Sequence, residues 1–382
     1  MTGALRVLVI GDHFGYPGGV SHGVTSYFLN VLPALVEAGV HVTTCFLREP
    51  HPAAEALRDH GVTPIFLSKR RMDPSAIVGL TVIARRNGCT VLHAAGIKAT
   101  LMARMAARLV PARTIVHLHD LLVPPFGVSG LQRAFARRTD MAVCVSRAAV
   151  PVAERCYHVS PDRVRVIHNG IRLDPFRMVP ADARPRIRET LGIPEGARVI
   201  GMVGRMHPVK GHSTMLRMLP RIVQSCPDVM LLLVGDGPER AACEVLVGTL
   251  GLQRNVSFLG QRSDVSAVLA ACDLTVVPSV SEGLSLAAIE SLAMAKPVVA
   301  FDVGGVGEVI DDRETGRLVP AGDCDAFIGA VLSLLLNEPE RRAYGVRAWS
   351  AVERFGIDRH VHQLIGCYRE VSGDGENIGG SQ

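Results

Sequence analysis

The feature that most limits the fold of this chain is an alternation of short apolar runs with segments of helical periodicity. The alternation runs once through the first half of the 382 residues and then starts again in the second. Apolar runs without polar positions between them are typical of strands that are buried on both faces. Strands that alternate with helices form a parallel sheet with helices on both sides. The sequence therefore predicts an α/β fold with two doubly wound domains.

Thirteen strands are predicted from these runs. In the first half they cover Leu5–Gly11, His41–Leu47, Pro64–Leu67, Thr90–His93, Arg113–His119, Met141–Val145 and Val164–Ile167. In the second half they cover Arg198–Gly204, Val229–Val234, Val256–Leu259, Leu274–Val277, Pro297–Phe301 and Gly316–Val319.

The join between the domains lies in a stretch from Asn169 to Gly196 that contains several prolines and has no strand periodicity. We expect an N-terminal domain over residues 1–175 and a C-terminal domain over 176–355. A helix over 356–372 is expected to pack back on the first domain, followed by a disordered tail over 373–382. The expected ligand site is the cleft outside the carboxyl ends of the two sets of strands.

The composition favours a cytoplasmic protein. The nine cysteines are scattered, odd in number and lack a Cys-x-x-Cys pair, so they are interpreted as small buried apolar residues in a reducing compartment. Met1 leads within a few residues into the first apolar run, Leu5–Ile10, with no cationic segment or cleavage site of a secretory leader. No apolar stretch is long enough to span a bilayer.

Positive charge is concentrated in the first half. Residues 1–175 carry a net charge of +9 and residues 176–382 carry −4. Clusters such as Lys69-Arg70-Arg71 fit a phosphate-bearing acceptor or an anionic surface on the inner face of a membrane, and a merely solvated basic surface is the alternative. Nucleic acid is not expected as a partner, because aromatic residues make up only 4% of the chain and no nucleic-acid-binding motif accompanies the charge.

The segment from Ser281 to Glu290 is the most informative for function. It follows a predicted strand and continues as a helix, so its backbone N–H groups and the positive end of the helix dipole can hold phosphate oxygens without a metal. Glu282 and Glu290 are eight residues apart, about 12 Å at helical rise. Two carboxylates so placed can accept hydrogen bonds from hydroxyl groups at the two ends of a ligand. A helix capped by Glu282, with Glu290 on its surface, explains the spacing equally well.

The same segment resembles the Glu-Gly-x-x-Leu-x-x-x-Glu signature of family 4 retaining glycosyltransferases. Further marks of that family occur in the expected order and cover nearly the whole chain: Pro17-Gly18-Gly19-Val20, His119-Asp120, His168–Ile171, Val203–Gly211, Val234–Pro238, Phe258–Gly260 and Gly304-Gly305. The resemblance implies the GT-B architecture, two Rossmann-like domains that face each other across a cleft. It implies that the first domain binds the acceptor and the second a nucleotide-sugar donor.

The resemblance also implies a role for each matching residue. Arg205 and Lys210 would neutralise the leaving diphosphate in place of a metal ion. Glu290 would hold the ribose hydroxyls, while Glu282 and His119 would hold the transferred sugar. The remaining donor contacts are backbone contacts, from Gly18, Gly19, Gly283, Leu284, Ser285 and Leu286. No metal and no cofactor are expected.

Other ligand chemistries are disfavoured by the motifs. The run from Gly11 to Gly19 is not a Gly-x-Gly-x-x-Gly fingerprint, so NAD is not expected. Asp323-Cys324-Asp325 has the Asp-x-Asp form of metal-dependent transferases, but it precedes a predicted helix, where Asp is a favoured cap. Leu284-Ser285 stands where the family signature often has an aromatic residue and glycine, so the family does not assign the donor sugar.

The predicted activity is retaining transfer of a hexose-type sugar to an acceptor hydroxyl on a glycolipid, a polysaccharide or a small molecule. This places the chain in the hexosyltransferase class. A nucleotide-sugar epimerase of the same architecture is an alternative, and a non-catalytic protein that binds sugar nucleotides is another. The presence of both Arg205 and Lys210 favours an enzyme.

Overall fold

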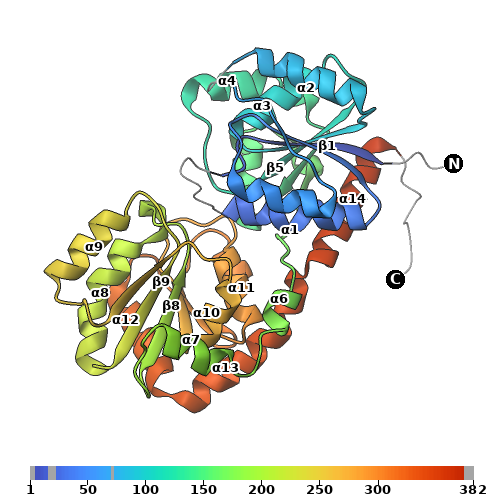
Figure 1. Cartoon of the computed structure of the whole chain (residues 1–382). Coiled ribbons are helices and arrows are strands. Elements are labelled where there is room, and N and C mark those ends of the chain that lie inside the picture. Colours follow the sequence, from blue (N-terminus) through green and yellow to red (C-terminus); the bar gives the residue numbers. More distant parts are fainter. Residues whose placement is uncertain (1–4, 16–22, 70–72, 374–382) are drawn as a thin grey trace, which may run out of the picture. The chain divides into compact units, whose positions relative to one another are not determined.

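The computed structural model describes residues 5–15, 23–69 and 73–373, and by their contacts these form two compact units. The first unit runs to Gly170 and resumes at Ile357, and the second unit is Ile171–Gly356. Each unit is a parallel sheet with helices packed on it (Figure 1). Ile171 starts the second unit because its N–H donates to the carbonyl of Phe355 and its backbone pairs with Gly356.

The first unit has a seven-stranded sheet in the order β3-β2-β1-β4-β5-β6-β7. Its strands are β1 (Arg6–Gly11), β2 (His41–Phe46), β3 (Ile65–Phe66), β4 (Val91–Ala95), β5 (Arg113–Leu118), β6 (Met141–Cys144) and β7 (Val164–Val166). The order reverses between β1 and β4, which makes the carboxyl edge of these two strands the switch point of the sheet.

The helices of the first unit cover both faces of its sheet. They are α1 (Gly23–Glu37), α2 (Ser75–Arg86), α3 (Ile97–Ala106), α4 (Phe126–Ala134), α5 (Val150–Arg155) and α14 (Ile357–Ser372), with 3₁₀ turns at Pro52–His60, Ala136–Arg138, Arg147–Ala149 and Pro161–Arg163. Alternate residues of β1 point to opposite sides. Val7 and Val9 pack with residues of α1 and α14, whereas Leu8 and Ile10 pack with residues of α2 and α3.

The second unit has a six-stranded parallel sheet in the order β10-β9-β8-β11-β12-β13. Its strands are β8 (Arg198–Val203), β9 (Val229–Val234), β10 (Val256–Gly260), β11 (Leu274–Val277), β12 (Val298–Phe301) and β13 (Gly316–Val319). Its helices are α6 (Asp174–Arg177), α7 (Ala183–Thr190), α8 (His212–Ser225), α9 (Arg240–Thr249), α10 (Val265–Ala271), α11 (Leu286–Ala293), α12 (Cys324–Leu336) and α13 (Glu338–Ala351), with 3₁₀ turns at Pro208–Lys210, Val306–Glu308 and Val352–Phe355. The switch point lies between β8 and β11.

The predicted fold class is confirmed, and all thirteen predicted strands are present in two parallel sheets. Their ends differ by at most two residues; the strand predicted to end at His93, for example, continues to Ala95. Asp323 caps α12, since its carboxylate accepts a hydrogen bond from the N–H of Ala326 at 2.9 Å. The nine cysteines are all free thiols. No helix in the described part of the chain is long and apolar enough to cross a membrane.

Candidate functional site

Three loops at the carboxyl edge of the second sheet are held together by backbone hydrogen bonds. The loop after β11 is joined to the loop after β8, because the N–H of Val280 donates to the carbonyl of Val209 at 2.8 Å. The loop after β12 is joined to the loop after β11 by the N–H of Gly305, which donates to the carbonyl of Glu282 at 3.0 Å. The switch point of this sheet is therefore a connected set of loops.

Gly211 allows the first two loops to lie close together. It has a φ of +75°, in the left-handed region, and a Cβ atom at this position would lie 1.9 Å from the carbonyl oxygen of Pro278. Any other residue would meet both backbone strain and a clash. Gly211 precedes α8, so it also fixes the place of Lys210 next to the loop after β11.

Lys210 and Glu282 form a bidentate ion pair across these loops. The Nζ of Lys210 lies 2.8 Å from Oε1 and 2.9 Å from Oε2 of Glu282. The hydroxyl of Ser279 also donates to Oε1, at 2.7 Å. The Glu282 side chain is 6% exposed and that of Lys210 is 32% exposed. The carboxylate is thus buried with its charge compensated, while the lysine remains open to a ligand.

The amino end of α11 is capped by Ser285. Its hydroxyl accepts a hydrogen bond from the N–H of Ala288 at 3.3 Å, and its φ of −81° requires no glycine. Serine therefore fits at this position without backbone strain, and the alternative in which Glu282 caps the helix is wrong. The N–H groups at the start of a helix have no acceptor within the helix. Those of Leu286 and Ala287 leave the amino end of α11 able to receive an anion.

Arg205 lies in the same loop as Lys210 and is half-buried. Burial lowers the pKa of the neighbouring His207, and the positive charges of Arg205 and Lys210 lower that pKa further. The fields of both cations therefore overlap at this loop. Their combined charge is suited to a polyanion such as a diphosphate.

Glu290 lies on α11, one helical turn before its end. Its side chain is half-buried, and burial raises the pKa of its carboxyl group from 4.5 to about 7. The group can therefore change its protonation state near neutral pH. Strongly shifted pKa values of this kind cluster at functional sites.

The other predicted site residues belong to the first unit or lie outside the described residues. His119 follows β5 directly, is half-buried, and packs against the rings of Tyr27 and His117. Gly18 and Gly19 fall outside the described residues. In the described part of the chain, no group of three or more His, Cys, Asp and Glu side chains is arranged to hold a metal ion.

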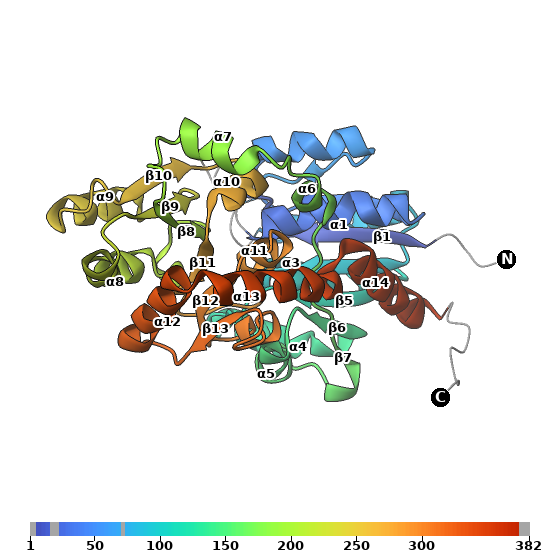
Figure 2. The same ribbon diagram turned by 90° about the horizontal axis from the view of Figure 1, so that it is seen from below.

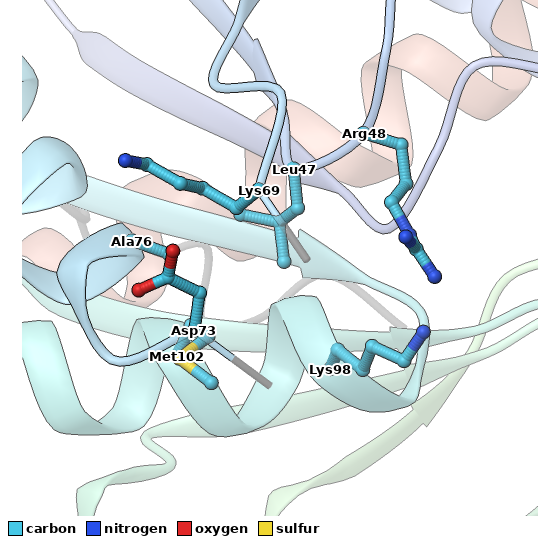
Figure 3. A pocket seen from close by; sticks show the side chains of 7 residues that line it. All are labelled: Leu47, Arg48, Lys69, Asp73, Ala76, Lys98 and Met102. Carbon is cyan, nitrogen blue, oxygen red and sulfur yellow. The ribbon is translucent and has the colours of Figure 1, made fainter. Parts of the chain in front are cut away.

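A small basic pocket in the first unit was not predicted as a site. It lies at the carboxyl edge of β2 and the start of α3 and is lined by Leu47, Arg48, Lys69, Asp73, Ala76, Lys98 and Met102. Figure 3 shows the cationic ends of Arg48 and Lys98 pointing toward each other, with the carboxylate of Asp73 on the other side of the pocket. Of these side chains, only Lys69 belongs to a charge cluster that is evident in the sequence. The strand ends near these residues had been predicted, but the convergence of Arg48 and Lys98 had not.

Family models match both units. The model described as Glycosyl transferases group 1 matches residues 183–349, and the model described as Glycosyltransferase Family 4 matches residues 21–175. The chain belongs to the family 4 glycosyltransferases. The resemblance seen in the sequence motifs is confirmed.

Two relatives illustrate the range of the family. The chain is 30% identical over 241 residues to D-inositol 3-phosphate glycosyltransferase of Corynebacterium urealyticum. The matched segment makes up 61% of this chain but only 57% of that relative. The chain is 27% identical over 303 residues to N-acetyl-alpha-D-glucosaminyl L-malate synthase of Bacillus anthracis, covering 77% of this chain and 78% of the relative.

Solved structures show the same fold. A glycosyltransferase from Rickettsia africae superimposes with a TM-score of 0.83 at 19% identity, covering 98% of this chain and all of that one. HepE from Anabaena, in complex with UDP and glucose, also superimposes with a TM-score of 0.83 at 21% identity. The match covers 96% of this chain and 100% of the HepE chain. These likenesses identify the two doubly wound units as the GT-B fold.

The Lys210–Glu282 pair predicts a particular pattern of stability. Lys210→Ala leaves a buried carboxylate without its counter-ion, and we expect it to lower the free energy of unfolding by about 3 kcal/mol. In the double variant Lys210→Ala/Glu282→Gln the remaining side chain is neutral, so most of the loss should be recovered. Urea unfolding of the two variants and the wild type measures both effects. Equal instability of the single and double variants would contradict the pairing.

The raised pKa of Glu290 predicts a pH-dependent effect of Glu290→Gln. Because the folded-state pKa is about 7 and the ordinary value is 4.5, the stabilising effect of the neutral carboxyl is complete below pH 4.5 and is lost as the pH rises through 7. Glutamine does not ionise. We therefore expect the variant to match the wild type in free energy of unfolding at pH 4 and to exceed it at pH 8 by on the order of 1–3 kcal/mol. Thermal unfolding of the wild type and the variant without ligand, measured across this pH range, tests the prediction. A difference in stability that does not change with pH would refute it.

Proposed function

We propose that this chain is a retaining glycosyltransferase that moves a hexose-type sugar from a nucleoside-diphosphate sugar to an acceptor hydroxyl without a metal ion. The observation that carries the proposal is the partly exposed Lys210, paired with the buried Glu282 beside the amino end of α11. A lysine, an arginine and a helix amino end in one connected set of loops supply positive charge for a diphosphate. The chain's membership of the family supports the same reaction class.

Most donor contacts are assigned to residues of the second unit. Lys210, Arg205 and the first amides of α11 bind the diphosphate, and Glu290 accepts hydrogen bonds from the ribose hydroxyls. Glu282 is held by Lys210 and Ser279 and binds a sugar hydroxyl from this fixed position. His119 of the first unit binds the same sugar. As the leaving phosphate gains negative charge, the two cations stabilise it, and the phosphate oxygen takes the acceptor proton, so no protein nucleophile is required.

The donor is proposed to be a UDP-sugar. HepE from Anabaena is described in complex with UDP-glucose, and the relative from Bacillus anthracis is named for the transfer of N-acetylglucosamine. UDP-glucose and UDP-N-acetylglucosamine are therefore the first donors to examine.

The acceptor is proposed to carry an anionic group that binds in the basic pocket of the first unit. Arg48 and Lys98 bring two cationic ends together there, with Lys69 and the carboxylate of Asp73 on the other side, so the pocket favours a phosphate or carboxylate near Arg48 and Lys98. The names of the two relatives refer to anionic small molecules, an inositol phosphate and malate. The net charge of +9 over residues 1–175 also fits an acceptor on a lipid at an anionic membrane surface, in which case the protein would work at the cytoplasmic face.

The two alternative functions make different predictions about the acceptor. A nucleotide-sugar epimerase would convert the donor without an acceptor. A non-catalytic binding protein would retain the donor unchanged. Both would use the same loops of the second unit, so only turnover with an acceptor distinguishes them from a transferase.

Donor binding is tested by thermal shift with UDP-, GDP- and TDP-sugars, each with and without EDTA. We expect UDP-glucose or UDP-N-acetylglucosamine to raise the midpoint of unfolding by several degrees, since a ligand at 100 times its Kd adds about 2.7 kcal/mol. EDTA should leave the shift unchanged. The stability-matched Lys210→Ala/Glu282→Gln variant should lose it. If no sugar nucleotide stabilises the wild type, the donor site is wrong.

Acceptor binding is tested by transfer to myo-inositol 3-phosphate, L-malate and uncharged myo-inositol. We expect an anionic compound to be the better acceptor and Lys98→Gln to raise its KM about tenfold, the loss of one charge-assisted hydrogen bond. The KM for the donor should not change. Arg86→Gln, a change of an exposed cation on α2, is the matched control. Equal use of charged and uncharged inositol would exclude the pocket as the acceptor site.

A further inference from the structure

Beneath the carboxyl edge of the first sheet lies a buried network of three histidines and two tyrosines. Its members are Tyr27, His93, His117, His360 and Tyr368, each at most 2% exposed. Tyr27 lies on α1, the first two histidines on β4 and β5, and the last two residues on α14. In Figures 1 and 2, α14 runs beside α1 on this unit. The last helix of the chain therefore contributes polar side chains to the core of the first unit.

Hydrogen-bond distances connect the network from one end to the other. The hydroxyl of Tyr368 lies 2.5 Å from Nδ1 of His93, and Nε2 of His93 lies 3.0 Å from Nδ1 of His117. Nδ1 of His117 is also 3.4 Å from the hydroxyl of Tyr27, which is 3.3 Å from Nε2 of His360. Nδ1 of His360 lies 2.8 Å from the carbonyl oxygen of His168.

The carbonyl of His168 determines where the protons lie. A carbonyl only accepts, so Nδ1 of His360 carries a proton and donates it. Burial lowers the pKa of His360 to about 4, so the ring is neutral near pH 7 and its Nε2 accepts from the Tyr27 hydroxyl. The oxygen of Tyr27 can then only accept from Nδ1–H of His117.

The same reasoning extends to the other end. Nδ1–H of His117 also donates to Nε2 of His93, so His93 carries its proton on Nδ1 and donates to Tyr368. Burial lowers the pKa of His93 to about 3 and holds that of His117 well below its usual value, so both rings are neutral. This arrangement satisfies all the contacts. The opposite tautomer of His117 would place two acceptors against each other at Tyr27.

His119 packs directly on this network. The centroid of its ring lies 4.0 Å from that of His117 and 4.3 Å from that of Tyr27. The proton arrangement leaves Nε2 of His117 bare, and this buried nitrogen has no hydrogen-bond partner among the described residues. His119 thus lies against two rings that hydrogen bonds link to α14. Tyr27 contacts His360 directly, and His117 is linked to Tyr368 through His93.

We propose that Tyr27 and His117 are positioning residues for His119, held in place by His360 and Tyr368 of the C-terminal helix. The helix thereby sets the orientation of a sugar-binding side chain from the far end of the sequence. This inference rests on the proposed function for the role of His119, but not for the network itself. A displacement of a substrate-positioning group by about 1 Å can lower turnover about 100-fold, so small movements of these rings matter.

The first test is of the network alone and needs no substrate. Long-range ¹H–¹⁵N NMR on the full chain reports which ring nitrogen of each histidine carries the proton. We expect His117 with a protonated Nδ1 and a bare Nε2, and all three network histidines neutral from pH 6 to 8. Tyr27→Phe keeps the ring but loses the hydroxyl, and we expect it to shift the ring resonances of His119. Protonation of His117 at Nε2, or His119 resonances that do not change, would overturn the proposal.

The second test separates positioning from a general loss of stability. We expect Tyr27→Phe to lower kcat for transfer about tenfold while the KM for the acceptor changes less than twofold. Tyr344→Phe removes the hydroxyl of another buried tyrosine, on α13 of the second unit, and should leave kcat unchanged. Equal kcat values for the two variants would overturn the proposal.

A pair of variants at His360 tests the individual bonds. His360→Gln keeps a group near the position of Nε2 that can accept from Tyr27, whereas His360→Asn keeps only a donor toward the His168 carbonyl. We expect the Gln variant to retain kcat within about threefold and the Asn variant to lose about tenfold. The reverse order would contradict the proton arrangement. If the wild type transfers no sugar at all, the proposed function fails, and the NMR experiment still decides whether α14 orients His119.

Discussion

The bidentate ion pair between Lys210 and Glu282 is the interaction on which the candidate site of the second unit depends. A buried carboxylate is costly unless it is paired and hydrogen-bonded, and Glu282 has both Lys210 and Ser279 as partners. The pairing leaves Lys210 partly exposed, so one cation serves two purposes. It compensates the glutamate, and it presents charge toward a ligand. For the proposed diphosphate ligand, Lys210 is already partly desolvated by its pairing with Glu282, which lowers the cost of forming the complex.

The backbone geometry around this pair is as demanding as its electrostatics. Gly211 has no Cβ to clash with Pro278, and only this close approach allows the loop of Lys210 to meet the loop of Glu282. The hydrogen bond from Gly305 adds a third loop at the same place. Three separate segments therefore fix the backbone and the side chain of a single residue, Glu282. Such support restricts its rotamers, and a fixed acceptor discriminates between sugar hydroxyls better than a mobile one.

Sequence periodicity was sufficient to predict the fold of both units because buried parallel strands leave a strong local signal. Runs such as Val229–Val234 are apolar on both faces, and helices separate the runs. The cap at Asp323 was predictable for the same reason, since a helix cap depends on the adjacent residues alone. Ser285 was different. It was seen as a departure from a family motif, whereas its hydroxyl supplies a cap that a glycine could not.

Contacts between distant segments left no such signal. Lys210 and Glu282 are 72 residues apart, and the sequence assigned one to the diphosphate and the other to the sugar of the donor but did not pair them. His93 and Tyr368 are 275 residues apart and each has an ordinary local context, a strand and an amphipathic helix. The position of the proton on His117 follows only once the His168 carbonyl is known to be an acceptor at the other end of the network. Local patterns thus determine which elements form, but the protonation and orientation of buried polar groups depend on partners that only the folded chain brings together.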